Sequence, residues 1–264
     1  MNSTLGPAAT EAILALADDE HLMGQQYAEW IGITPFLEED LAFCSIGQDE
    51  MGHAALLYEL LVPSTDAPGE APHTPNATGT DTDTEIDAIA FFRPPEEYRS
   101  CWLTEIPEED WAAAVVRHWL YDRAELLRWR LFESSTVPGL GAVAQRVERE
   151  EVYHRRHADG LLDVLLDDDD AGPRLRAGLA RWQPIAAGMF EPVVSESEAI
   201  AEGVQSGSVA DLRPEWEAMV AERFGTGHWP TPTGQLGRTV RSAEFGPLMT
   251  RMREVLDLDP TAIW

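Results

Sequence analysis

The sequence contains no lysine, and its 19 basic residues, all of them arginines, are outnumbered by 47 aspartates and glutamates. Without lysine, the protein cannot form a lysine Schiff base or use the lysine of a phosphate-binding P-loop. The net charge of −28 disfavours contact with nucleic acid or anionic membranes, because both are negatively charged. We therefore expect neither nucleic acid nor a membrane as a partner.

Cysteine and long apolar stretches are also scarce. The two cysteines, Cys44 and Cys101, lack the spacing of a CxxC or zinc motif, which favours reduced thiols in a cytoplasmic protein. No uncharged apolar run reaches the roughly 18 residues that would predict a transmembrane helix. The first residues, MNSTLGPAAT, have neither the basic nor the apolar segment of a signal peptide. These features predict a cytoplasmic location.

Apolar residues recur at steps of three and four along most of the chain, and long alternating runs are absent. This period predicts an all-α protein. We expect a single domain over 1–264, with a four-helix bundle at about 8–166 and a helical extension at about 170–264. The segment at about 63–85 is rich in Pro, Thr, Asp and Gly. It predicts a mobile loop at the midpoint of the bundle, where some bundles have a long crossover connection.

The expected helices follow from the apolar period and from proline and glycine breaks. Thr34 is expected to cap the second helix, with Pro35 in its first turn, and Pro107 to begin the third. The long helices are predicted at about 8–31, 35–61, 107–133 and 140–166. Shorter helical pieces are predicted at about 86–92, 95–103, 173–190, 196–205, 213–224 and 246–256.

Two stretches carry the same metal-binding pattern, Glu-x-x-His. One is formed by Glu50 and His53, the other by Glu151 and His154. A spacing of three places both side chains on one helix face, where a carboxylate and an imidazole can bind the same metal ion. Both pairs also lie on the apolar stripe of their helices. Two such pairs, with a carboxylate from each of two further helices, form the di-iron or di-manganese site of ferritin-like bundles.

The first and third helices each place one carboxylate on the apolar stripe, Glu20 and Asp122 respectively. At 1.5 Å per residue, Glu20 and Glu50 lie about 20 and 25 Å from the turn near residue 33. Asp122 and Glu151 lie about 24 and 20 Å from the turn near residue 138. Antiparallel hairpins would therefore bring these groups to one height. We predict that two metal ions are bound by Glu20, Glu50, His53, Asp122, Glu151 and His154.

Glu50 and Glu151 are expected to bridge the two ions, and the other four residues to be terminal ligands. Buried carboxylates are costly without a cation, although an empty polar core is the alternative. Imidazole and carboxylate ligands with open positions favour iron, with manganese as the second choice.

Several neighbours of these residues have candidate roles. Asp49 is a candidate to orient a ligand imidazole through an outer hydrogen bond. His118 and Glu125 lie within one turn of Asp122 and are candidates to replace it, although partly exposed polar side chains are the simpler interpretation. Trp129 is most simply a core residue.

Three further segments carry a family resemblance: AEWIGITPFLE at 28–38, LTEIP at 103–107 and FGPLMTRMR…W at 245–264. They resemble the phenylacetyl-CoA epoxidase family of ferritin-like di-iron proteins, which act in phenylacetate catabolism. The likeness extends over nearly the whole chain and is greatest to the C subunit. In that family the C subunit has usually lost metal ligands and acts as a scaffold for the catalytic A subunit.

Other motifs are similar to the catalytic subunit instead. QDEMGH at 48–53, EEVYH at 150–154 and WLYD at 119–122 resemble its ligand motifs, and Glu20 falls at the position of its first-helix ligand. The resemblance therefore implies a C-type backbone that carries a complete A-type ligand set. That combination favours a catalytic protein over a scaffold.

The implied activity is O₂-dependent hydroxylation or epoxidation of a small organic or carrier-bound substrate by a di-iron monooxygenase. The alternatives are a non-catalytic scaffold subunit, or a di-iron desaturase, N-oxygenase or oxidase. The cofactors would be two iron ions, with O₂ as co-substrate. Because no flavin, nicotinamide or Fe–S motif is present, electrons would come from an external donor such as a reductase. We expect a homodimer or a family heteromer.

The substrate is less well defined by the sequence. No basic cluster that would anchor coenzyme A stands out. Arg155 and Arg156 are candidates, with a solvated helix face as the simpler interpretation.

Overall fold

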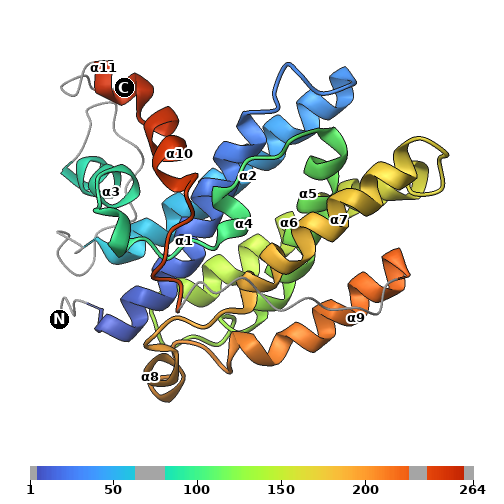
Figure 1. Ribbon diagram of the computed structural model, residues 1–264. Coiled ribbons are helices and arrows are strands. Elements are labelled where there is room, and N and C mark those ends of the chain that lie inside the picture. Colours follow the sequence, from blue (N-terminus) through green and yellow to red (C-terminus); the bar gives the residue numbers. More distant parts are fainter. Residues whose placement is uncertain (1–4, 63–80, 226–236, 259–264) are drawn as a thin grey trace.

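The computed structural model describes residues 5–62, 81–225 and 237–258. These residues form helices and irregular connections and contain no strand, which confirms the prediction of an all-α protein (Figure 1). A search of the same residues finds no helix with the length and hydropathy needed to span a membrane.

Four long helices form a ferritin-like bundle. They are α1 (Pro7–Ala28), α2 (Leu37–Leu61), α5 (Trp111–Arg130) and α6 (Leu140–Leu165). Helices α1 and α2 pack together as one hairpin, α5 and α6 as a second, and α2 packs against α6. The arrangement follows from the apolar stripes, since each helix buries the face that carries its apolar residues.

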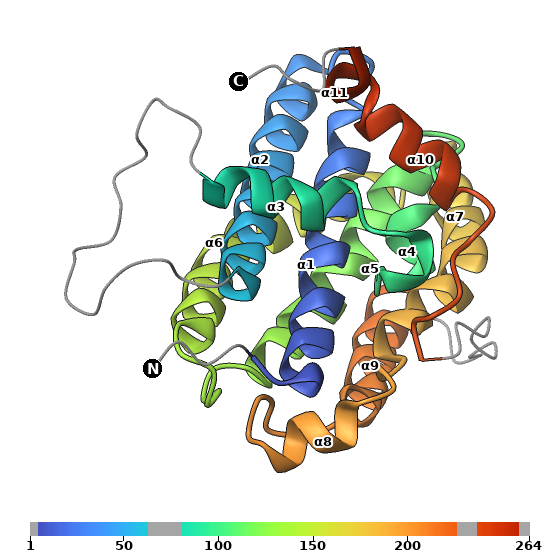
Figure 2. The ribbon, with the colours of Figure 1, turned by 90° about the vertical axis from the view of Figure 1, so that its left-hand side faces the viewer.

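The remaining elements surround this bundle. They are α3 (Asp81–Phe91), α4 (Trp102–Glu105), α7 (Ala171–Ala186), α8 (Glu196–Ala201), α9 (Arg213–Phe224), α10 (Phe245–Met252) and α11 (Glu254–Leu258), with 3₁₀ turns at Pro95–Glu97, Ala187–Phe190 and Val209–Leu212. Helix α7 packs along α5. Helix α3 crosses the face of the bundle over α1 and α2 (Figure 2).

Two predicted helix starts are wrong because side chains further along the chain fix the turns. Phe36, not Thr34, is the residue before α2. The carboxylate of Asp40 accepts hydrogen bonds from the backbone N–H of Gly32 and of Thr34, and from the Thr34 hydroxyl, so these residues form a closed turn rather than a helix start. Helix α5 begins after Asp110, which accepts a hydrogen bond from Ala113 N at 2.8 Å.

The segment predicted as a loop at 63–85 is partly helical. Residues 63–80 lie outside the described part of the chain. Residues 81–85 belong to α3, so the helix begins about five residues earlier than its apolar period indicates. The piece predicted at 95–103 is instead a 3₁₀ turn followed by the separate short helix α4, and the piece at 246–256 is two helices, α10 and α11.

Helices α1 and α2 approach closely at a pair of glycines. A Cβ atom on Gly24 would lie 3.1 Å from the Gly47 carbonyl oxygen, and one on Gly47 would lie 3.2 Å from the Gly24 oxygen. Larger side chains would force the two helices apart. Gly24 lies one turn after Glu20 and Gly47 one turn before Glu50, so this contact sets the separation of two candidate metal ligands.

Candidate metal centre

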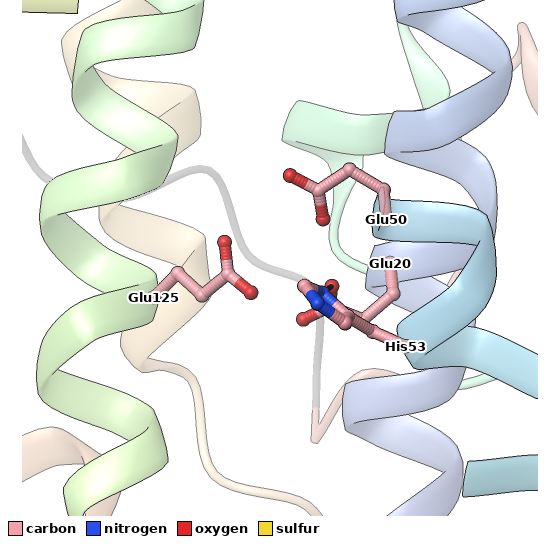
Figure 3. A group of neighbouring side chains, drawn as sticks. All are labelled: Glu20, Glu50, His53 and Glu125. Atoms are coloured by element: carbon pink, nitrogen blue, oxygen red, sulfur yellow. Dashed lines mark hydrogen bonds and ion pairs between the residues drawn. The ribbon is translucent and has the colours of Figure 1, made fainter. Parts of the chain in front are cut away.

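Three helices bring four buried ionisable side chains to one point. Glu20 comes from α1, Glu50 and His53 from α2, and Glu125 from α5. Each offers one ligand atom that lies within 4.8 Å of those of the others. In Figure 3, the Glu125 carboxylate faces the other three side chains across the space between the helices. All four are at most 1% exposed.

A second group adjoins the first and shares one residue with it. Glu50, Glu151 and His154 also place ligand atoms within 4.8 Å of one another, and all three are buried. The Nδ1 atom of His154 lies 2.8 Å from a Glu151 oxygen and 3.5 Å from a Glu50 oxygen. Because Glu50 belongs to both groups, it has the position that a bridging carboxylate requires.

Asp122 lies outside both groups, whereas Glu125 is part of the first. Asp122 is fully buried, and its carboxylate lies 3.1 Å from the Nδ1 atom of His118. The same nitrogen is 2.7 Å from the Tyr27 hydroxyl. The interpretation of His118 and Glu125 as partly exposed residues is wrong, since both are buried in the bundle.

The two imidazoles are oriented in the same way by reciprocal contacts. Nδ1 of His53 lies 3.2 Å from Glu20, and its Nε2 lies 2.8 Å from the Glu150 carboxylate. Nε2 of His154 lies 3.2 Å from the Asp49 carboxylate. The residue before each motif's glutamate thus contacts the histidine of the other motif. A hydrogen bond from Nε2–H to a carboxylate leaves Nδ1 free to bind a metal.

The sequence suggests Asp49, but not Glu150, as the residue that orients a ligand imidazole. The position of Glu150 could have indicated its role, because Glu150 precedes Glu151 as Asp49 precedes Glu50. Trp129 was likewise assigned only to the core. Its indole N–H donates to Glu125 at 2.8 Å and lies 3.2 Å from Glu20, so it links the carboxylates of α1 and α5.

Removing either outer carboxylate is expected to weaken metal binding. Asp49→Asn and Glu150→Gln keep the size of the side chain but remove the negative charge that holds the imidazole. We expect each to lower iron affinity by about 10–100-fold, measured anaerobically by competition with an Fe(II) chelator. Glu148→Gln, at an exposed position of the same helix as Glu150, is the matched control. Equal affinities in all three variants would contradict this role.

The electrostatics of the site favour a bound cation. Burial raises the pKa of Glu20, Glu50 and Glu125 well above the ordinary value, and neighbouring carboxylates raise it further. For His154, burial lowers the pKa, but the carboxylates of Glu151, Asp49 and Glu50 together outweigh this and raise it overall. Metal-free protein therefore holds extra protons at this site, which a dication would displace.

Unpartnered oxygens provide the structural test of whether metal ions fit here. Both carboxylate oxygens of Glu50 and both of Glu151 are buried and make no hydrogen bond of good geometry among the described residues. Their ion-pair neighbour is Nδ1 of His154, which lies 2.8 Å from a Glu151 oxygen and 3.5 Å from a Glu50 oxygen. Leaving such groups unsatisfied costs about 1–3 kcal/mol each, and more if they are charged. Ordinary core carboxylates avoid this cost by pairing, as Asp19 does with Arg128 and Arg238 in the same bundle. Carboxylate and imidazole donors are the ligand set of di-iron and di-manganese sites, so the residues fit such a group.

Comparison with known proteins gives two matches. The family model described as phenylacetic acid catabolic protein matches residues 1–264. The chain is also similar to the C subunit of 1,2-phenylacetyl-CoA epoxidase from Escherichia coli (strain K12), with 25% identity over 261 residues. That alignment covers 97% of this chain and 98% of the Escherichia coli protein.

Proposed function

Because the chain belongs to the phenylacetic acid catabolic protein family, we propose that it is a non-haem di-iron oxygenase that hydroxylates or epoxidises a small organic or carrier-bound substrate. The observation that supports this proposal is the pair of buried groups that share Glu50. A chain that served only as a scaffold would have no need to keep unpartnered carboxylates in its core, because apolar residues of similar volume would be no less stable.

The proposed ligands are Glu20, His53 and Glu125 for one iron, and Glu151 and His154 for the other, with Glu50 between them. Asp122 stays a candidate for the second iron, because its carboxylate is buried and makes no hydrogen bond of good geometry among the described residues beyond the 3.1 Å contact with His118. Two iron ions at this site would supply the binding and reductive activation of O₂.

The residues of the chain would hold the ions and exclude water. The ligands come from helices rather than loops, and the Gly24–Gly47 contact fixes two of those helices against each other. Asp49 and Glu150 would keep the two imidazoles oriented. Electrons would come from an external donor, such as a reductase.

A scaffold role in an epoxidase-type complex is the second candidate, because the similar Escherichia coli protein is by its name the C subunit of such an enzyme. Desaturase, N-oxygenase and oxidase activities use the same kind of metal site, so they are alternative reactions for the di-iron enzyme of the first proposal. A homodimer or a family heteromer is the expected assembly.

Anaerobic loading with Fe(II) separates these candidates. We expect about two irons per chain, as in other bundles with this ligand set, measured by metal analysis after desalting. With a chemical reductant present, O₂ uptake is expected to increase when substrate is added. A chain that retains no iron would support the scaffold role. Stoichiometric iron oxidation that is independent of substrate would instead indicate an oxidase.

A further inference from the structure

An open groove lies beside the candidate metal centre and includes none of its proposed ligands. It has a volume of about 610 Å³ and lies between the α1–α2 turn, the start of α5, the second half of α6 and the start of α7. Trp111, Leu161 and Leu175 contribute to an apolar lining. Phe36 and Val164 at its edge are 68% and 74% exposed. Size and lining are those of a small-molecule site, for which volumes of about 300–1,000 Å³ are usual.

The groove is close to the candidate metal ligands through His157. This residue lines the groove and follows the ligand candidate His154 by one helical turn. Its Nδ1 lies 3.2 Å from Nε2 of His118, whose other nitrogen lies 3.1 Å from Asp122. The Phe43 ring packs against both imidazoles. His157 and His118 therefore connect the groove to Asp122, which lies beside the two candidate ligand groups.

Each acidic side chain that lines the groove has a local partner. The Glu39 carboxylate lies 2.9 Å from Nε2 of His157, and Asp110 accepts from the Ala113 N–H. Asp170 forms an ion pair with Arg174. Arg156 also lines the groove, and among the described residues it has no ion-pair partner. Arg156 is exposed, so its guanidinium is accessible to an anionic ligand in the groove, although the net charge of −28 disfavours ligands with several negative charges.

We propose that the groove binds an apolar monocarboxylic acid, with the apolar part along Trp111 and Leu161 and the carboxylate on Arg156. A guanidinium can bind one carboxylate through two parallel hydrogen bonds. The several phosphate charges of coenzyme A would call for further unpaired cations, which the described lining of the groove lacks. The assignment of this acid as the substrate rests on the proposed oxygenase function, whereas its binding does not.

Gly160 offers a way to fill the groove without disturbing the fold. It lies on α6 in the lining, and a Cβ atom there would meet no other atom within 4 Å. Gly160→Phe adds an aromatic ring inside the groove and replaces glycine by a better helix former. Gly246→Phe is the matched control, because Gly246 lies in the exposed face of α10 and its Cβ is equally free.

The probe is 4-phenylbutyrate, titrated into the full-length metal-free protein by isothermal calorimetry. We expect saturable binding that Gly160→Phe weakens by at least about tenfold, since the ring takes the ligand's volume, and that Gly246→Phe leaves unchanged. Arg156→Gln should weaken binding by about tenfold or more, the value of a hydrogen bond to a charged group. Arg149→Gln, at an exposed position on the same helix, should not.

Other outcomes would overturn the proposal. The first is that 4-phenylbutanol binds as tightly as the acid. The second is that coenzyme A binds more tightly than the acid and that Arg156→Gln weakens this binding. The third is that Gly160→Phe changes the oligomeric state, which would indicate that a second copy of the chain occupies the groove. A separate portion of each preparation is loaded anaerobically with Fe(II), and its iron content is measured after desalting. A protein that binds the acid but retains no iron after loading would support the groove site and contradict the oxygenase. A protein that retains iron but does not bind the acid would do the reverse.

Discussion

Glu50→Met is expected to abolish iron loading while leaving the metal-free protein as stable as the unaltered protein, or more so. Glu50 is the residue shared by the two candidate ligand groups, so its removal would affect both of the proposed metal positions. Its carboxylate is fully buried, and neither of its oxygens has a hydrogen-bond partner among the described residues. Replacing a buried ionic group by an apolar one of similar volume is neutral or stabilising by about 1–4 kcal/mol.

The stability difference should also depend on pH. Burial raises the pKa of Glu50, and the Glu125 charge raises it further. A carboxyl group whose pKa is raised by folding favours the folded state at low pH, and this contribution is lost as pH rises above the ordinary glutamate pKa towards the folded one. The advantage of Glu50→Met over the unaltered metal-free protein should therefore increase with pH across this window.

Iron content after anaerobic loading and urea unfolding of the metal-free protein are the two measurements. Glu148→Met, at an exposed position of α6, is the control and should change neither. If Glu50→Met instead lowered the free energy of unfolding by several kcal/mol, the carboxylates would be a structural polar core. The metal-centre proposal would then lose its main support.

Asp19→Asn is expected to destabilise the protein by about 3–5 kcal/mol, the cost of leaving a buried cation without its partner. Asp19 is buried beside Glu20, and one of its oxygens lies 2.7 Å from Arg128 and 2.8 Å from Arg238. Its other oxygen accepts from the Cys101 N–H at 2.7 Å. The contacts join α1, α5, the segment before α4 and the segment before α10, so their loss affects four parts of the fold.

The contrast with Glu50 is informative because both carboxylates are completely buried. Although burial raises the pKa of Asp19, Arg238 and Arg128 outweigh it and hold the pKa below the ordinary value. The contribution of Asp19 is therefore present above the ordinary aspartate pKa and is lost as pH falls towards the folded one. The effect of Asp19→Asn should shrink on acidification, opposite in sign to the trend for Glu50→Met.

Urea unfolding of the metal-free protein over a pH series measures this effect. Asp170→Asn is the matched control, since its ion pair with Arg174 lies on the surface and is expected to contribute less than about 1 kcal/mol. A loss for Asp19→Asn no larger than that of the control would show that the two arginines find other partners or water.

The helical fold and the paired ligand motifs follow from the sequence alone. The spacing of Glu50 from His53 and of Glu151 from His154 is local, and the helical period converts it directly into a shared face. Their positions on apolar stripes then implied burial, as the structure shows. Helix starts were less well predicted, because Asp40 and Asp110 fix the turns through contacts that no apolar period contains.

Which side chain of α5 joins the first ligand group is instead a matter of tertiary packing. Asp122 and Glu125 are three residues apart on one face, so the helical period cannot distinguish them. The choice depends on the rotation of α5 against α1 and on side-chain length, and it places Glu125 beside Glu20. The reciprocal contacts of Asp49 and Glu150, and the burial of Arg238 against Ala15 and Asp19, likewise depend on packing between segments far apart in the chain.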